Sequence, residues 1–293
     1  MANLKEVRYR ITSVNSTQQI TSAMKMVSAS KLRRAQDAII KLRPYANKLK
    51  EILQNLSSNL DNSSEGAYSK QRKVQKVLLI AISSNRGLCG AFNSNVIKAT
   101  NVLINTTFAE QFKSNNGSIM TFGKKVSEFY AKRPYPIFES NNQIFDHLTF
   151  NNVAPLAEKV MKAFATGNFD KVVIIYNQFK NAAVQILSTE DYLPIVPQEN
   201  EVVKKSKMDY IFEPNKEEIV SELIPKSLKI QLYKALLDSH AAEHGARMTA
   251  MHKATDNAQE LLKELRLTYN KARQAAITNE ILEIVGGAEA LKG

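Results

Sequence analysis

Apolar residues recur with heptad spacing along the first 60 residues. Of the 17 positions that continue this spacing from Leu4 to Leu60, 13 are apolar. Chance would give about seven or eight at this overall apolar content. The spacing predicts a coiled-coil helix from about Ala2 to Leu60.

A second long helical run starts after Pro225 and reaches Leu291 without another proline. Small residues in its middle would allow another helix to approach closely. At 1.5 Å per residue, two helices of about 60 residues would each extend roughly 90 Å, far longer than a domain core needs. This length indicates a shaft-like element that holds or moves something.

Two features interrupt the first helix. Four consecutive heptad positions are polar, namely Gln18, Thr21, Lys25 and Ser28. Three apolar residues nearby lie on another face, namely Ile20, Met24 and Val27. Either the helices stop packing on each other here and another partner contacts the segment, or the seam drifts around the helix. Pro44 should kink or locally open the helix.

The middle of the chain predicts strands that alternate with helices. Short apolar runs favour buried strands at 77–82, 118–123 and 171–176, with helices expected over 91–109, 124–131 and 152–167. The stretch 134–150 looks irregular. A hairpin turn over 177–181 should lead into an antiparallel edge strand over 182–189. The order indicates a Rossmann-like α/β domain with a mostly parallel sheet.

These patterns divide the chain into four parts. We expect an N-terminal coiled-coil helix over 1–60, a central α/β domain over 73–193, a connecting loop over 194–214 and a C-terminal coiled-coil helix over 215–293.

Positive charge is concentrated on the first helix. Residues 1–50 hold 11 Lys or Arg against two acids, a net charge of +9 within the chain total of +12. A basic helix suggests an acidic partner, which could be nucleic acid, anionic lipid or an acidic protein surface, or else a solvated face.

The single cysteine, Cys89, excludes an intramolecular disulfide. No apolar run approaches the roughly 20 residues of a transmembrane helix, and no signal peptide is visible. We expect a cytosolic chain that is not inserted in a membrane but is able to attach to something there.

The candidate catalytic groups are weak. The loop Ser84–Gly90 opens a helix after a strand, as phosphate loops do, but it lacks a dinucleotide or P-loop fingerprint. For the loop, a tight strand-to-helix turn is favoured over nucleotide binding. For Cys89, a buried structural role is favoured over that of a nucleophile. His240 and His244 share a helix face without a metal-site motif, and Glu280 and Glu283 suit partner contacts better than acid–base work. We expect no catalytic site, cofactor or metal.

The C-terminal end is apolar around most of its circumference. The residues responsible are Ile277, Ile281, Leu282, Ile284, Val285 and Ala288. A helix that is apolar all round has to be enclosed by another structure.

Three segments resemble the gamma-subunit family of F-type ATP synthases. They are the first-helix stretch from Ile11 to Gln36, the loop from Asn85 to Asn93, and the terminal stretch from Ile277 to Ala290 preceded by Lys271–Ala275. The segments follow the family order, whereas residues 100–225 resemble the family mainly in layout.

The resemblance implies an antiparallel coiled coil in the central cavity of an alpha/beta hexamer. It further implies that the α/β domain contacts epsilon and the c-subunit ring, at the cytoplasmic face of a bacterial plasma membrane. Proton flow would turn the ring and this chain, and ATP would form on beta. The chain itself would be a non-catalytic, peripheral subunit.

The family pattern also implies positions of contact with the hexamer. These are Met24, Lys25, Arg273, Gln274, Thr278, Ile281, Leu282 and Val285. The structural turn of the α/β domain would be formed by Arg86, Gly87, Cys89 and Gly90. Asn15 and Gln19 stand where basic residues are common in the family, and Asn85 where an acid is common, which puts those contacts in doubt. The alternatives are a basic coiled-coil protein that binds nucleic acid and a nucleotide-dependent enzyme built on the α/β domain.

Overall fold

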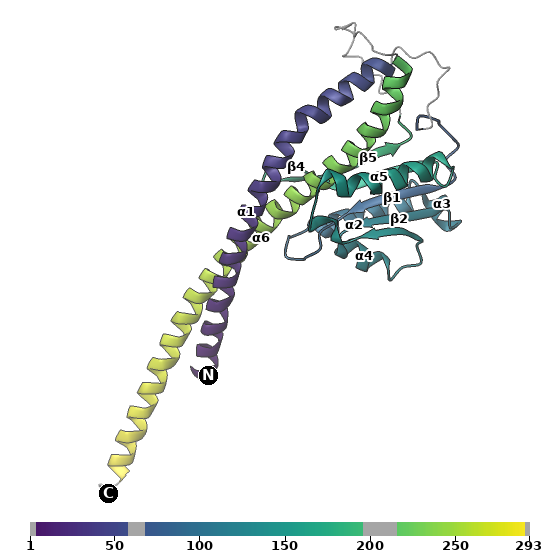
Figure 1. Cartoon of the computed structure of the whole chain (residues 1–293). Helices are drawn as coiled ribbons and strands as arrows, with labels where there is room; N and C mark the ends of the chain where they lie inside the picture. Colours follow the sequence, from purple (N-terminus) through teal and green to yellow (C-terminus); the bar gives the residue numbers. More distant parts are fainter. Residues whose placement is uncertain (1–3, 58–67, 196–215, 291–293) are drawn as a thin grey trace. The chain divides into compact units, whose positions relative to one another are not determined.

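The computed structural model describes residues 4–57, 68–195 and 216–290. The chain divides into two compact units, one made of Met1–Ala29 with Arg247–Gly293 and the other of Ser30–Ala246. Helix α1 (Leu4–Ser57) and helix α6 (Lys216–Ala290) contribute to both units (Figure 1). The connecting segment expected over 194–214 lies almost entirely outside the described residues.

The two long helices predicted from the sequence are confirmed, with one correction. Helix α6 begins at Lys216, in agreement with the expected C-terminal helix over 215–293, but Pro225 lies inside the helix and does not precede it. Ile224 packs against the domain core and Leu228 is buried, so tertiary contacts on both sides hold the helix through the proline. Pro44 likewise lies within α1, which continues to Ser57.

In the first unit, α1 and α6 pair as an antiparallel coiled coil. Thr21 contacts Thr255, while Tyr9 and Val14, nearer the chain start, line a hollow with Leu265, nearer the chain end. The heptad positions from Leu4 to Ser28 are all buried or half-buried. The heptad pattern therefore identifies the face of α1 that packs on α6.

The second unit contains a five-stranded sheet in the order β3-β2-β1-β4-β5. Its strands are β1 (Val77–Ile82), β2 (Gly117–Phe122), β3 (Ile137–Asn141), β4 (Lys171–Phe179) and β5 (Gln185–Leu193). Strands β1 to β4 run parallel, and β5 runs antiparallel to β4. This topology confirms the mostly parallel α/β layer.

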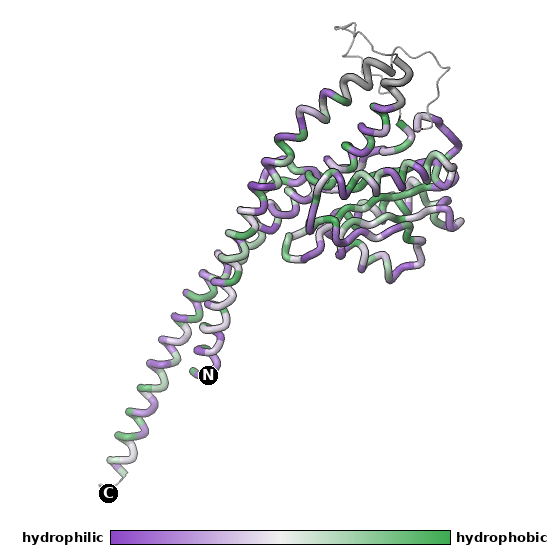
Figure 2. Tube along the Cα trace, viewed as in Figure 1, coloured by the Kyte–Doolittle hydropathy of each residue, from purple (hydrophilic) through white to green (hydrophobic). Residues whose placement is uncertain are grey.

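Helices cover both faces of this sheet. The remaining helices are α2 (Phe92–Asn105), α3 (Ala109–Lys113), α4 (Lys124–Tyr130), the 3-10 helix η1 (Gln143–Phe145) and α5 (Phe150–Ala165). Leu78, Ile80 and Ile82 of β1 join a core with α5 and the first part of α6, whereas Val77 and Leu79 join a core with α2, α3 and α4. Every β1 residue is therefore buried, as its continuous apolar run predicts, and Figure 2 shows the central strands as hydrophobic.

Three local expectations are wrong, each for a physical reason. The stretch expected to be irregular contains β3, an exposed edge strand whose sequence has no apolar alternation. The helix expected over 91–109 breaks after Asn105, because the intervening turn directs Phe108 into the core.

The hairpin turn also lies later than expected. Strand β4 continues through Asn177, whose buried amide donates to the carbonyl of Phe92 over 3.0 Å. The turn follows at Asn181, whose side-chain oxygen accepts from the backbone N–H groups of Ala183 and Val184 at 3.0 and 2.7 Å. The sequence pattern predicts that the strand ends before Asn177, because this residue is polar. In the structure Asn177 is buried and belongs to the strand.

We predict that Gly123→Ala destabilises the α/β domain by about 2–4 kcal/mol, because it combines a steric clash with backbone strain. Gly123 has φ +95°, and an added Cβ would lie 2.3 Å from the Ser83 carbonyl oxygen. Gly87→Ala is the matched control, since its Cβ would meet no atom within 4 Å. Urea unfolding of both variants would measure this difference, and equal stabilities would contradict the assigned backbone geometry.

Candidate functional site

The polar segment of α1 stays on the seam of the coiled coil. Thr21 and Ser28 are buried, and the Thr255 hydroxyl donates to Thr21 Oγ1 over 2.9 Å. The Ser28 hydroxyl donates back to the Met24 carbonyl over 2.7 Å. The expectation that the helices stop packing here is therefore wrong, and so is the alternative that the seam drifts.

The apolar residues beside this seam point outward. Ile20, Met26 and Val27 are 60, 66 and 57% exposed, although all three are large hydrophobic side chains. Because α6 occupies the seam on the other face, these side chains leave an apolar surface on the outside of α1. A partner outside this chain remains a suitable occupant for such a surface.

Lys25 lies at the edge of the same seam. Its Nζ is 3.4 Å from Nδ1 of His252, and that same nitrogen is 3.3 Å from Oδ2 of Asp256. Nδ1 of His252 accepts from Lys25 when it carries no proton and donates to Asp256 when it carries one, so the two bonds exclude each other. Lys25 thus has a partner on α6 in only one state of the imidazole, and Met24 beside it is half-buried.

The far end of α6 is bare. All residues from 276 to 290 are exposed, including Thr278, and so are Arg273 and Gln274 one turn earlier. The large apolar side chains in this segment are between 50 and 66% exposed, namely Ile277, Ile281, Leu282, Ile284 and Val285. So many exposed large apolar side chains on one helix segment indicate a partner that covers them.

Basic residues line the exposed face of α1. Those exposed in the described part of the helix include Lys5, Arg8, Arg10, Lys31, Arg33, Arg34, Lys41 and Lys48. Arg43 differs, because its guanidinium contacts buried groups of other elements. The positive surface is therefore available to an acidic partner along most of α1.

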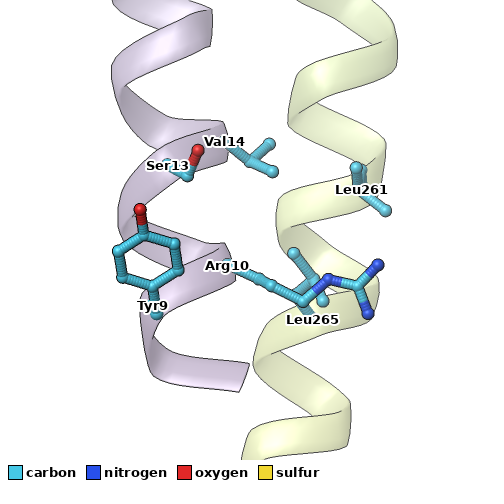
Figure 3. A pocket seen from close by; sticks show the side chains of 6 residues that line it. All are labelled: Tyr9, Arg10, Ser13, Val14, Leu261 and Leu265. Atoms are coloured by element: carbon cyan, nitrogen blue, oxygen red, sulfur yellow. The ribbon is translucent and has the colours of Figure 1, made fainter. Parts of the chain in front are cut away.

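A shallow hollow lies between the two helices of the first unit. It has a volume of about 280 Å³ and is lined by Tyr9, Arg10, Ser13, Val14, Leu261 and Leu265. Figure 3 shows the Arg10 side chain extending from α1 across to α6 beside Leu265. The hollow is slightly below the roughly 300 Å³ at which small-molecule sites usually begin, so it gives little support to a cofactor site.

The loop after β1 is filled by its own side chains. Asn93 accepts from the Ser84 N–H over 2.9 Å and donates from Nδ2 to the Ser84 hydroxyl and the Cys89 thiol at 2.9 and 3.3 Å. Cys89 is 1% exposed. A phosphate loop keeps its N–H groups open for the ligand, whereas here Ser84 is already bonded. The arrangement supports the structural turn around Arg86, Gly87 and Gly90.

Asn85 has two structural contacts within this region. Its Oδ1 accepts from the Lys124 N–H at the start of α4 over 2.9 Å, and its Nδ2 donates to the Asn142 carbonyl over 2.7 Å. An acid at this position could make the first bond but not the second. An asparagine at position 85 therefore lacks the negative charge of an acid but makes an additional hydrogen bond to Asn142, the residue after β3.

Sequence reasoning missed one exposed feature of this loop. Leu88 is 65% exposed and adopts φ +62°, a left-handed conformation that is unusual for a bulky residue. The signal that could have revealed it is the apolar residue between Gly87 and Gly90, in a loop otherwise occupied by polar groups.

The other candidate groups do not form a catalytic or metal centre. The Nε2 atoms of His240 and His244 are 3.1 Å apart, but in the described ranges no cluster of three or more His, Cys, Asp or Glu could hold a metal. Glu280 and Glu283 are both exposed. None of the helices in these ranges is long and apolar enough to cross a bilayer.

Comparisons with known proteins give a consistent result. A family described as ATP synthase matches residues 3–291. A protein named ATP synthase gamma chain from Flavobacterium johnsoniae is 62% identical over 293 residues, with complete coverage of both chains. The gamma chain of Chloroherpeton thalassium is 47% identical over 301 residues and covers 100% of this chain and 99% of its own.

Solved structures agree with these relatives. A chain in the central stalk and c-ring structure of the Tetrahymena thermophila mitochondrial ATP synthase has a TM-score of 0.61 at 26% identity, covering 80% of this chain and 99% of its own. A chain of the Euglena gracilis mitochondrial ATP synthase in rotational state 3 has a TM-score of 0.68 at 21% identity, covering 98% and 94%. The second likeness concerns the fold alone.

We predict that Thr21→Val destabilises the coiled coil by about 1 kcal/mol, because it removes the hydroxyl that accepts from the half-buried Thr255 across the seam. Replacing both Thr21 and Thr255 by Val should cost less than the sum of the two single changes, since the two hydroxyls share one hydrogen bond. Thr12→Val is the control, because that hydroxyl is exposed and bonds only to the Arg8 carbonyl in its own helix.

Urea unfolding followed by circular dichroism would measure these stabilities. Losses that simply add in the double variant would contradict the coupling between the two threonines.

Proposed function

The chain belongs to the ATP synthase gamma chain family, and from this premise we propose how its surfaces serve the central stalk of a proton-translocating F-type ATP synthase. In this role α1 and α6 form the rotor shaft. Turning of a membrane ring is passed through the chain to catalytic subunits, where ATP is made or hydrolysed. The chain itself carries out no chemistry.

The observation that carries this proposal is the bare apolar end of α6. We assign its enclosure to the alpha and beta subunits, which surround residues 276–290 as a sleeve. Ile281, Leu282 and Val285 would supply apolar contacts that tolerate rotation, because such contacts are non-directional. Arg273, Gln274 and Thr278 precede this segment and would form polar contacts with beta.

The outer face of α1 supplies the second contact. Met24 and Lys25 lie beside the exposed apolar residues Ile20 and Val27, and basic residues continue on either side. We propose that acidic loops of beta meet this face, with the apolar residues giving contact area and the basic residues giving charge complementarity.

The α/β domain would make the contacts on the membrane side of the complex. We propose that it contacts the epsilon subunit and the ring of c subunits, at the cytoplasmic face of a bacterial inner membrane. The filled loop at Ser84 and the buried Cys89 support a structural role for this domain. The exposed Leu88, held in a strained conformation, is suited to anchor one of these contacts.

The nucleic-acid hypothesis finds no support among the relatives. The charge on α1 that suggested it is equally complementary to an acidic protein surface. A nucleotide-dependent enzyme is also disfavoured, because the side chains of the loop after β1 bond to one another.

We predict that the purified chain, mixed with alpha and beta subunits of a close relative, forms a complex that hydrolyses ATP. Alpha and beta without this chain are the control. Gel filtration and an ATPase assay would measure both properties. A chain that stays separate from the hexamer, or adds no steady hydrolysis, would contradict the proposed function.

We further predict that Ile281→Glu with Val285→Glu weakens binding to the hexamer at least about tenfold, because two carboxylates would be moved into an apolar sleeve. Ile281→Leu with Val285→Leu is the matched control, since it keeps both positions apolar. Titration of the hexamer with labelled chain would compare the affinities. Equal affinity of the charged and apolar variants would exclude an apolar enclosure at these residues.

A further inference from the structure

A short part of α6 within the second unit is enclosed on nearly all sides. Residues 235–246 are buried except for His240, which is half-buried. In this part of α6, Asp238 lies against Arg43 of α1, and Gly245 lies against Ala182 in the turn between β4 and β5. Polar residues occur here among small ones, so specific contacts as well as apolar packing hold the helix in place.

Arg43 connects three elements at this point. Its Nη2 donates to the Phe179 carbonyl at the end of β4 over 3.2 Å and lies 3.4 Å from Oδ1 of Asp238 on α6. One side chain of α1 thereby contacts both the hairpin of the α/β domain and the other long helix.

The Asp238 carboxyl in this contact is buried and depends on Arg43 for a charged partner. Its side chain is fully buried, and within the described residues its Oδ2 has no hydrogen-bond partner. Burial raises the pKa of the Asp238 carboxyl, while the charge of Arg43 opposes that shift. A buried carboxylate is costly without its partner, so the pair is sensitive to any displacement that separates Arg43 from Asp238.

The hairpin also touches α6 through the backbone. A Cβ added at Gly245 would lie 3.1 Å from the Ala182 oxygen and 3.2 Å from the Ala182 Cα. Glycine inside a helix costs about 1 kcal/mol relative to alanine, and close packing against Ala182 accounts for it here. The backbone of α6 therefore packs closely against the turn that follows β4, with no room for a side chain between them.

We propose that Arg43, Phe179, Ala182, Asp238 and Gly245 form a junction that transmits torque between the α/β domain and the two long helices. This proposal rests on the rotor function proposed above and assigns its point of transmission. Other contacts of α6 with the domain include apolar packing of Leu228, Leu232 and Leu236 in the core and the ion pair of Lys229 with Glu158 on α5, but the Arg43 contact is the one described here that also includes α1. Apolar contacts resist separation but are non-directional, whereas the ion pair and the backbone contact resist sliding.

The test uses the complete ATP synthase with its hexamer immobilised and its catalytic sites held by a non-hydrolysable nucleotide. A probe on the α/β domain reports angular fluctuations, whose width gives the torsional stiffness of the rotor. The main variant is Arg43→Met with Asp238→Leu. Apolar replacement of both members of a buried ion pair is often neutral or stabilising, so this variant keeps the fold while it removes the directional contact.

We expect the double variant to lose at least about half of the torsional stiffness while its thermal stability is retained. Gly245→Leu, which pushes the hairpin away from α6, should reduce stiffness in the same direction. The matched control is Lys171→Met with Asp191→Leu, which removes a more exposed ion pair of 3.1 Å between β4 and β5. This control should leave stiffness unchanged.

Unchanged stiffness in a stable double variant would overturn the torque-transmitting junction, even if the unmodified complex rotates normally. Failure of the unmodified chain to assemble or rotate would instead count against the rotor function. If the single variants Arg43→Met and Asp238→Asn lose stability, the double variant still decides between a structural and a torque-transmitting role.

Discussion

The unequal reach of the two paired helices is the constraint on which the rest of this structure depends. Helix α1 begins at Leu4, and its antiparallel register brings Tyr9 and Val14 beside Leu261 and Leu265. Helix α6 continues to Ala290, so its last turns extend beyond the start of α1 in the described chain. Those turns expose five large apolar side chains, namely Ile277, Ile281, Leu282, Ile284 and Val285. A single helix with this surface is stable in water only at a cost, and enclosure by other subunits removes that cost.

The two helices of the coiled coil pair through one face of α1, and the opposite face of α1 is left for contacts with other proteins. The inner face of the coiled coil stays paired even where the heptad positions are polar, because Thr21 and Thr255 bond to each other. Its outer face can then be apolar at Ile20 and Val27 and basic elsewhere without disturbing the pairing. A polar pair on the seam also favours one register, since a slip would break the hydrogen bond between the Thr21 and Thr255 hydroxyls. The shaft thus keeps its internal geometry while its outer contacts change.

Much of the fold could be predicted from the sequence, because its strongest patterns have one physical explanation. The continuous apolar run of β1 predicts burial on both faces, and the heptads predict the paired face of α1. Edge strand β3 could not be predicted, because its exposed side chains follow no alternation. The extension of β4 depends on a bond between Asn177 and Phe92, far apart in the sequence.

The candidate site was predictable to a similar extent. The apolar end of α6 is visible in the residues themselves, whereas the contact roles that the resemblance implies for Met24, Lys25 and Arg273 stay predictions. The contacts of Arg43 with other elements were not predictable, because a basic residue on a basic helix is expected to be exposed to solvent. Its contacts with Phe179 and Asp238 exist only once three distant segments meet. The exposed, strained Leu88 likewise depends on loop geometry.

Rotation of this chain inside the hexamer is the central claim, and direct observation of that rotation is its sharpest measurement. A fluorescent probe on the α/β domain would be followed in complexes fixed to a surface through the hexamer, with ATP supplied. The account predicts continuous turning in one direction that stops when ATP is removed. A probe that only fluctuates about one orientation while ATP is hydrolysed would contradict it.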